Sequence, residues 1–161
     1  MRIGHGFDAH RLEAGRRLYL GGVEIPHEKG LLGHSDADVL LHALMDALLG
    51  AAALGDIGKH FPPSDMAYRD IRSTVLLKAV AEKIAKAGFC LCNADITVMA
   101  ERPKLAPYIE KMRQTVADIL GTGLDSISIK ATTTEKMGFT GREEGIAAEA
   151  VCLLYKMQEV K

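Results

Sequence analysis

The sequence has no tryptophan, few aromatic residues of any kind and only three cysteines. It also lacks an apolar run behind a basic start, which argues against a secretory signal. The apolar stretch over residues 39–54 contains a histidine and an aspartate and is too short and polar to span a bilayer. Cys90, Cys92 and Cys152 are an odd set in a chain without an export signal, so we expect reduced thiols, a cytoplasmic location and no membrane partner.

A strong excess of charge of either sign is also missing. Lysine and arginine total 20, aspartate and glutamate total 21, and the formal net charge is −1. The basic residues are spread along the chain, so we expect no nucleic-acid partner. An anionic substrate would depend on local cations or a bound metal ion, because the overall field will not attract it. The length of 161 residues predicts one domain, over residues 1–161.

Periodicity and turn residues predict strands in alternation with helices. Strands are expected over residues 2–8, 89–100, 127–133 and 145–155, with a hairpin or bulge at Gly21-Gly22. Helices are expected over residues 35–54, 73–87 and 103–120, with a loop over 55–65. Ser35 would cap the first helix, with Asp38 in capping-box position. The order of elements predicts an α/β fold, an α+β sandwich with one mixed four-stranded sheet and helices on one face.

Two short motifs bring together residue types that bind metal ions. In GHGFDAHRL, residues 4–12, the period of a strand puts Asp8 and His10 on one face. In HSDADVLLH, residues 34–42, His42 falls on the predicted helix and reaches the other two only if helix and strand pack together. One carboxylate and two imidazoles suit Zn²⁺ and leave a fourth position open, as in catalytic sites. The alternative is a surface strand pair beside a buried structural histidine.

The predicted helix also places acidic residues beside His42. Asp38 and Asp46 lie four residues before and after it, along one line of the helix. Either carboxylate could accept the imidazole N–H that does not bind metal, and so fix the tautomer. We expect Asp38 to serve only as a cap. Asp46 is costly to bury without a partner, so we expect it to support His42.

A second candidate site is the segment TTTEKMGFTGR, residues 132–142, which combines hydroxyls, glycines and cations. Such a segment can hold phosphates through backbone N–H groups and charge-assisted hydrogen bonds. Glu135 would repel phosphates unless a divalent cation such as Mg²⁺ lies between them. A polar hairpin loop is the alternative. The sequence contains no glycine-rich phosphate loop and no dinucleotide-binding fingerprint.

Four longer motifs extend these sites: GHGFDAHRL, HSDADVLLHALMDALLGAAALGDIGKHFP, AERPKL and KATTTEKMGFTGREEGIAAEAV. Together, in this order from Met1 to about Leu154, they resemble the 2-C-methyl-D-erythritol 2,4-cyclodiphosphate synthase family. The resemblance implies an enzyme, a phosphorus–oxygen lyase of non-mevalonate isoprenoid-precursor synthesis. Its substrate would be 4-diphosphocytidyl-2-C-methyl-D-erythritol 2-phosphate, and its products the cyclic diphosphate and CMP. It also implies a homotrimer whose sheets face the three-fold axis, with active sites between subunits.

The resemblance further assigns roles to individual residues. Metal and catalytic roles fall on Asp8, His10 and His42 as ligands of one Zn²⁺ per chain, on Glu135 for a second ion, Mg²⁺ or Mn²⁺, and on His34 and Thr133 as transition-state stabilisers. The residues implied to bind substrate are Asp8, Ala9, His10, His34, Ser35, Asp56, Ile57, Gly58, Phe61, Pro62, Pro63, Ser64, Asp65, Ala100, Glu101, Arg102, Pro103, Lys104, Leu105, Ala106, Ala131, Thr132, Thr133, Thr134, Glu135, Phe139 and Arg142.

The sequence departs from the family pattern at a few positions. Gly33 and Ala37 stand where alanine and glycine are expected, Pro63 replaces an acidic loop residue, and Glu143 stands where glycine is usual. At the first two positions we expect backbone contacts to survive. Pro63 cannot supply the side-chain contacts of an acidic residue, and Glu143 adds a carboxylate near Arg142 that could weaken an anion site there.

The face of the first strand opposite the zinc ligands bears on the predicted trimer. It carries Ile3, His5 and Phe7, and a sheet with helices on one side leaves this face uncovered. Three such faces meeting on an axis would bury it. The alternative function is a binding module without turnover, which would hold an isoprenoid diphosphate in a cavity along that axis with Arg142 at its mouth. A metal-dependent phosphohydrolase, which would release free phosphate, is a third interpretation.

Overall fold

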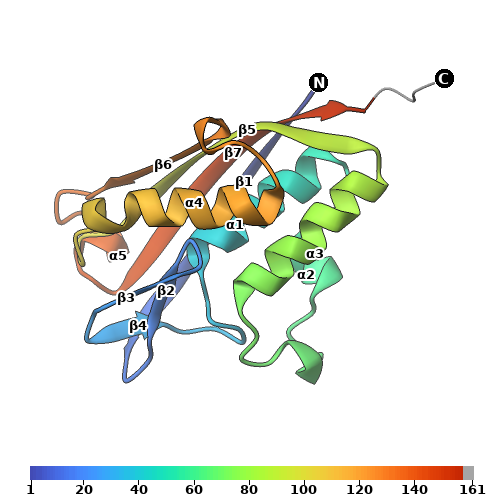
Figure 1. Cartoon of the computed structure of the whole chain (residues 1–161). Coiled ribbons are helices and arrows are strands. Elements are labelled where there is room, and N and C mark those ends of the chain that lie inside the picture. Colours follow the sequence, from blue (N-terminus) through green and yellow to red (C-terminus); the bar gives the residue numbers. More distant parts are fainter. Residues whose placement is uncertain (158–161) are drawn as a thin grey trace.

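The computed structural model describes residues 1–157, and residues 158–161 of the predicted domain lie outside the described part. The strands are β1 (Arg2–Ala14), β2 (Leu18–Leu20), β3 (Val23–Ile25), β4 (Lys29–Leu31), β5 (Phe89–Met99), β6 (Ile127–Thr132) and β7 (Gly145–Lys156). Five of them form one sheet in the order β4-β1-β7-β5-β6, and β2 pairs with β3 in a separate hairpin (Figure 1). The main sheet is mixed, because β5 and β6 run parallel and the other neighbours run antiparallel.

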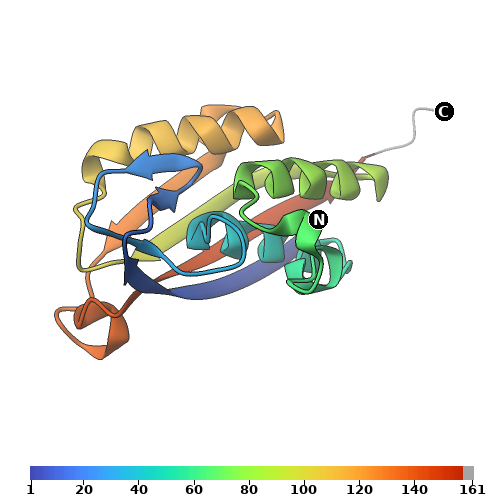
Figure 2. The same ribbon diagram turned by 90° about the horizontal axis from the view of Figure 1, so that it is seen from below.

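Helices cover one face of this sheet (Figures 1 and 2). The long ones are α1 (Val39–Ala51), α3 (Ser73–Lys86) and α4 (Ile109–Leu120). The short ones are α2 (Ile57–His60), α5 (Gly138–Gly141) and the 3-10 turns η1 (Met66–Tyr68), η2 (Ala106–Tyr108) and η3 (Leu124–Ser126). The predicted α/β architecture, with a mixed sheet and helices, is confirmed. Among the described helices, none is long and apolar enough to cross a membrane.

The sheet has five strands, so the prediction of four is wrong. The additional strand is β4, which pairs antiparallel with β1 and places Leu31 opposite Leu12. This strand is three residues long and has no alternation of polar and apolar residues, the signal on which a strand prediction depends. β1 also continues beyond the predicted residues 2–8, because β7 and then β4 supply hydrogen-bonding partners along its whole length.

The first long helix is shorter than predicted at both ends. Asp38, rather than Ser35, is its N-cap, because the Asp38 carboxylate accepts a hydrogen bond from the Leu41 N–H at 3.1 Å. The Ser35 hydroxyl instead accepts a hydrogen bond from the Ala37 N–H at 3.1 Å. At the other end, Ala53 takes a left-handed conformation with φ 58°, which stops the helix before the predicted boundary.

Two further segments differ from the prediction, and both matter for the site. Residues 103–105 are not helical, and η2 precedes α4. The predicted loop over residues 55–65 contains the short helix α2. The structure therefore keeps residues 101–105 as an irregular segment after β5 and gives the loop after α1 a defined helical turn.

α1 lies very close to β1. An added Cβ on Gly4 would fall 1.9 Å from the Ala47 carbonyl oxygen, and one on Gly6 would fall 2.0 Å from the Ala43 carbonyl oxygen. No side chain can occupy such positions, so glycine lets the helix backbone rest on the strand. His42 is adjacent to Ala43 in sequence. The close contact therefore carries His42 to the strand that holds the other predicted zinc ligands.

The two faces of the sheet differ in exposure. We call the side toward the helices the inner face and the opposite side the outer face. Along β1 the inner face carries Gly4, Gly6, Asp8, His10 and Leu12, all buried or half-buried. The outer face carries Ile3, His5, Phe7, Glu149, Val151 and Tyr155, all exposed. The predicted alternation of the first strand is confirmed, since Ile3 is 73% exposed and Phe7 51% exposed.

Candidate functional site

Three side chains from two elements meet at the inner face. Asp8 and His10 come from β1 and His42 from α1. Asp8 Oδ2 lies 2.9 Å from His10 Nε2 and 3.0 Å from His42 Nδ1, and the two imidazole nitrogens are 3.2 Å apart. We call this group the metal cluster. It is the one group of this kind among residues 1–157 whose ligand atoms all converge, which confirms the predicted contact of helix and strand.

The geometry of the metal cluster fits a single divalent ion. Ligand atoms about 2.0–2.1 Å from a tetrahedral zinc lie roughly 3.3 Å from one another, close to the spacing observed here. His10 Nδ1 lies 2.7 Å from the Leu32 carbonyl oxygen, so this nitrogen donates its proton and Nε2 keeps a lone pair for the ion. Three protein ligands leave a coordination position free for water or a substrate oxygen, as in catalytic metal sites.

The electrostatics of the metal cluster favour an ionised carboxylate. Burial acts to raise the pKa of Asp8, but hydrogen bonds from His10 and His42 outweigh it and hold the pKa well below its ordinary value. For His10, burial acts to lower the pKa, and the Asp8 carboxylate outweighs it, so the pKa of His10 is raised. Asp8 is therefore negative at neutral pH, and a cation bound there gains from its charge.

The second ring nitrogen of His42 faces hydroxyl groups. Its Nε2 lies 3.0 Å from Ser73 Oγ and 3.3 Å from Ser35 Oγ. The expectation that Asp46 supports His42 is wrong, because Asp46 Oδ1 accepts a hydrogen bond from the Ile57 N–H at 2.8 Å. Asp46 thereby anchors the start of α2. Sequence reasoning missed Ser73, since no local pattern links it to a histidine that lies 31 residues away.

The metal cluster lines a cavity of about 260 Å³. Its other lining residues are His34, Ser35, Ile57, Gly58, Phe61, Pro63, Tyr68 and Leu76. Tyr68 and Leu76 were not predicted: Tyr68 contacts the Phe61 ring edge-on at 5.4 Å between centroids, and Leu76 has the spacing of a core residue of α3. Ala9 and Phe139 line a neighbouring cavity that shares His10 with the first.

The segments predicted to form the nucleotide pocket lie beside one another. The Ala100 N–H donates to the Thr132 carbonyl at 3.0 Å, which places residues 100–106 and 131–135 at the carboxyl ends of the parallel strands β5 and β6. A cavity of about 560 Å³ there is lined by His27, Glu28, Glu101, Arg102, Pro103, Lys104 and Glu143. This cavity shares no lining residue with the metal cavity. Within the described chain, the two predicted halves of the site are therefore separate.

Two features of these segments are typical of ligand-binding regions. One Glu101 oxygen, Oε2, is buried without a hydrogen-bond partner among the described residues, and such atoms usually need a ligand, ion or water. Glu135 and Lys136 have φ angles of 52° and 64°, left-handed conformations that cost a non-glycine residue roughly 1–2 kcal/mol. The Thr133 hydroxyl donates to Glu135 Oε1 at 3.0 Å, so the predicted stabiliser and the predicted ligand of the second ion lie together.

Arg142, which the resemblance places among the anion-binding residues, is paired with a carboxylate. Its Nε and a terminal nitrogen donate to the two Glu144 oxygens at 2.9 and 3.1 Å. Glu143, the unusual residue at this point, instead lies 3.7 Å from Arg102. The carboxylate that competes with an anion at Arg142 is therefore Glu144, and Glu143 interacts with the nucleotide segment.

Comparison with known proteins identifies relatives of this chain. The YgbB family model matches residues 1–155. A 2-C-methyl-D-erythritol 2,4-cyclodiphosphate synthase of Syntrophomonas wolfei is 62% identical over 154 residues, which are 96% of this chain and 98% of that relative. The solved structure of the bifunctional IspDF of Campylobacter jejuni matches with a TM-score of 0.95 at 44% identity, over 99% of this chain and 43% of that chain. A 2C-methyl-D-erythritol-2,4-cyclodiphosphate synthase in a CDP-bound form matches with a TM-score of 0.88 at 40% identity, over 96% of this chain and 100% of that chain. The chain belongs to the YgbB family.

Proposed function

We propose that this chain converts 4-diphosphocytidyl-2-C-methyl-D-erythritol 2-phosphate to 2-C-methyl-D-erythritol 2,4-cyclodiphosphate and CMP, in non-mevalonate isoprenoid-precursor synthesis. The observation that carries the proposal is the metal cluster at a cavity wall, in a chain 62% identical over 154 residues to a named synthase. A solved relative 40% identical to this chain binds CDP, and the substrate carries a cytidine diphosphate group.

The reaction would be an intramolecular phosphoryl transfer. An oxygen of the 2-phosphate forms a bond to the β-phosphorus. The bond between that phosphorus and the oxygen that bridges it to the α-phosphate breaks, and this oxygen leaves as part of CMP. The nucleophile is tethered to its electrophile, so folding the substrate in the cavity supplies several kcal/mol of the acceleration. A phosphate is already deprotonated enough to attack, so the site requires no general base.

The residues of the chain would bind and orient the phosphates. The metal cluster would hold Zn²⁺, and Glu135 would hold Mg²⁺ or Mn²⁺; such ions withdraw charge from phosphate oxygens. His34 lines the same cavity as the metal cluster and would donate a hydrogen bond to an oxygen whose negative charge grows in the transition state. Thr133 would do the same beside Glu135.

We infer that the working unit is a homotrimer with the sheets around a three-fold axis. The outer face exposes Ile3 and Phe7 by 73% and 51%, and exposed apolar surface of this kind marks protein contacts. The metal cavity and the cavity that contains Lys104 share no residue, so a neighbour's nucleotide segment would complete the site. An isoprenoid diphosphate near Arg142 and a cytoplasmic location remain predictions, as does a single domain.

The direct test supplies the cytidyl substrate, Zn²⁺ and Mg²⁺ to the purified chain and identifies the products. We expect the cyclic diphosphate and CMP in equal amounts. Release of free phosphate would indicate a phosphohydrolase, and tight binding without turnover would support the binding module. The matched variant His42→Ala should lose about one zinc ion per chain, together with cyclisation, because three ligands are needed to hold the ion. Full zinc occupancy of this variant, measured by elemental analysis, would contradict the assignment.

A further inference from the structure

Asp36 has no part in the proposed chemistry, yet its carboxylate is buried and surrounded by donors. It is 9% exposed. Oδ2 accepts hydrogen bonds from Arg72 Nε and from the Ser73 N–H, both at 3.0 Å. Oδ1 accepts hydrogen bonds from the Ser73 hydroxyl at 2.5 Å and from the Asp38 N–H at 3.3 Å. Each of these contacts comes from a donor, so both Asp36 oxygens act as acceptors.

Because the Ser73 hydroxyl donates its hydrogen bond to Asp36, it can act only as an acceptor toward His42. A serine hydroxyl has a single proton, and the Ser73 hydroxyl donates it in a hydrogen bond to the Asp36 carboxylate. Ser73 Oγ therefore accepts a hydrogen bond from the His42 Nε2–H, at 3.0 Å. Ser35 Oγ is farther from this nitrogen, at 3.3 Å, and accepts a hydrogen bond from the Ala37 N–H; its second lone pair is left to accept a weaker share of the same Nε2–H.

The proton on Nε2 determines what the other nitrogen of His42 can do. A neutral imidazole carries one proton, so Nδ1 is left with a lone pair. Nδ1 is the atom that lies 3.0 Å from Asp8 Oδ2 in the metal cluster. His10 reaches the equivalent state differently, because its second nitrogen donates directly to the Leu32 carbonyl oxygen. Each imidazole of the metal cluster thus has an acceptor behind it.

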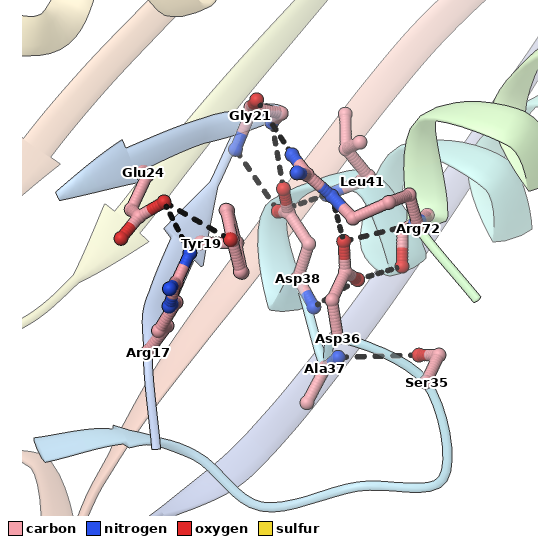
Figure 3. A network of polar contacts seen from close by, with 12 residues as sticks. Arg17, Tyr19, Gly21, Glu24, Ser35, Asp36, Ala37, Asp38, Leu41 and Arg72 are labelled. Atoms are coloured by element: carbon pink, nitrogen blue, oxygen red, sulfur yellow. Dashed lines mark hydrogen bonds and ion pairs between the residues drawn. The ribbon is translucent and has the colours of Figure 1, made fainter. Parts of the chain in front are cut away.

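Arg72 holds Asp36 in place. Its guanidinium carbon lies 3.9 Å from the centroid of the Tyr19 ring, and one terminal nitrogen donates to the Gly22 carbonyl at 3.1 Å. Figure 3 shows the Arg72 side chain reaching Asp36, with Asp38 alongside. The hairpin of β2 and β3, the segment before α1 and the start of α3 are therefore joined at the Asp36 carboxylate.

We propose that Ser73 and Asp36 are positioning residues of the metal centre. Asp36 accepts a hydrogen bond from the Ser73 hydroxyl, and Ser73 Oγ in turn accepts one from His42 Nε2–H, which holds His42 in the tautomer whose Nδ1 can bind a metal ion. This inference rests on the proposed metal-binding role of His42. Removing an outer partner of a metal-ligating histidine typically weakens metal binding about 10–100-fold, which sets the expected effect here.

Two variants and a control test the proposal. Ser73→Ala removes the acceptor behind His42. Asp36→Asn keeps the shape of the side chain but can place an amide donor beside Ser73, so that the Ser73 hydroxyl turns to donate to Nε2 and favours the tautomer that cannot bind metal through Nδ1. Thr74→Ala is the matched control, because the Thr74 hydroxyl makes none of the hydrogen bonds that join Asp36, Ser73 and His42. The Thr74 methyl group faces Gly22, so this variant also controls for a disturbance of the hairpin.

The first readout is the zinc dissociation constant, measured by competition with a chromophoric chelator. The second is the nuclear magnetic resonance signal of the His42 ring N–H in the zinc-loaded, ¹⁵N-labelled protein. We expect zinc binding to weaken about 10–100-fold in Ser73→Ala and Asp36→Asn but not in Thr74→Ala. The wild-type Nε2–H should be protected from exchange with water, and Ser73→Ala should lose that protection. If Asp36→Asn does not fold, Ser73→Ala, which removes one oxygen atom, decides alone.

The outcomes separate this inference from the proposed function. A Ser73→Ala variant that binds zinc as tightly as Thr74→Ala overturns the positioning role, even if the wild-type chain forms the cyclic product. An unprotected His42 ring proton in the zinc-loaded wild type overturns it as well. If Ser73→Ala weakens zinc binding and the wild-type chain forms no cyclic product, the positioning role stands and the proposed function fails.

Discussion

The two faces of the main sheet differ in what covers them. On the inner face, α1 rests on Gly4 and Gly6, and little room remains for side chains. On the outer face of the same strand, Ile3 and Phe7 extend into solvent. β1 thus reverses the usual arrangement, in which the large apolar residues of a strand point to the core and the small or polar ones point outward. The helices of the chain itself cover the inner face, whereas the large apolar side chains of the outer face are exposed to solvent.

This difference explains where the metal cluster lies. The close contact of α1 with β1 brings a helix residue, His42, within 3.0 Å of a strand residue, Asp8. A helix held at an ordinary distance by larger side chains would leave these ligands apart. The glycines that make the inner face tight are therefore a condition for the site. The outer face contributes none of the ligands of the metal cluster.

The largest effect is expected from a methyl group added to the inner face. In Gly6→Ala the new Cβ would lie 2.0 Å from the Ala43 carbonyl oxygen, so α1 must move away from β1. We expect a loss of stability on the order of 3 kcal/mol or more, because this overlap involves backbone and not a flexible side chain. Chemical denaturation followed by circular dichroism measures the loss, and zinc binding should weaken with it.

The control for that variant is Gly50→Ala, in α1 itself. An added Cβ on Gly50 meets nothing within 4 Å, and alanine is favoured over glycine in a helix. We therefore expect Gly50→Ala to be stabilising by roughly 0.5 kcal/mol. Equal stability of Gly6→Ala and Gly50→Ala would show that the close contact of helix and strand does not hold the inner face together.

The next effect should appear on the outer face and leave the single chain folded. Val151 is 41% exposed on β7, and Val75, on α3, is 55% exposed. If the outer face is buried between chains, Val151→Glu places a charge in that contact and should weaken assembly at least about tenfold. Val75→Glu, the matched control, should not. Sedimentation velocity measures the assembly, and a Val151→Glu protein that sediments like the control would contradict a contact through the outer face.

The comparison of the faces also shows what the sequence can predict. The alternation along β1 and the apolar spacing of the long helices are local patterns, so the two faces could be predicted from them. The joining of His42 to Asp8 and His10 follows from the family resemblance, because local spacing leaves it conditional on the packing of helix and strand. β4 and the contact of Ser73 with His42 could not be predicted, because β4 is a three-residue strand without alternation and no motif links Ser73 to His42. The role expected of Asp46 failed for a related reason.

Helical spacing tells which residues share one side of a helix, but not which atoms of other elements they meet. Asp46 lies on the same line of α1 as His42, but its carboxylate accepts a hydrogen bond from a backbone N–H of α2 instead of from His42. The segments expected to bind the nucleotide could be located from their motifs. Their separation from the metal cavity within one chain could not, since it depends on how the loops after β5 and α1 are placed.

Cysteine alkylation offers a further test of the tight inner face, through the difference in rate between a buried and an exposed cysteine. Cys152 is 2% exposed on the inner face, opposite Gly4, and burial raises its pKa to about 11. Cys92 is exposed at the bulge of β5. The thiolate is the reactive form, so a pKa raised from 9.0 to about 11 lowers the reactive fraction of Cys152 roughly 100-fold at pH 8.

Peptide mapping by mass spectrometry after alkylation measures both sites. In the folded chain, Cys92 should react first and Cys152 should remain unmodified. In the Gly6→Ala variant, Cys152 should become reactive, because the inner face opens. Equal rates at the two cysteines of the wild-type chain would contradict the tight inner face.

The last comparison concerns the coupling between Gly33 and Ala37, which exchange the alanine and glycine of the family pattern. An added Cβ on Gly33 would lie 2.9 Å from the Ala37 Cβ and 3.1 Å from His10 Cε1, so only one methyl group fits between these residues. Ala37 is buried with φ 55°. Ala37→Gly should relieve about 1 kcal/mol of left-handed strain and lose a similar amount through the more flexible unfolded chain, for little net change.

Gly33→Ala alone should cost about 1–3 kcal/mol through its overlap with the Ala37 methyl. In the double variant, with Ala37→Gly, that overlap is gone and only the closer approach to the His10 ring remains. We therefore expect the double variant to recover about 1 kcal/mol relative to the sum of the single changes, measured as a double-mutant cycle by denaturation. Additive effects would mean that the two methyl groups do not exclude one another. In that case the exchange of residues here would have no steric cause.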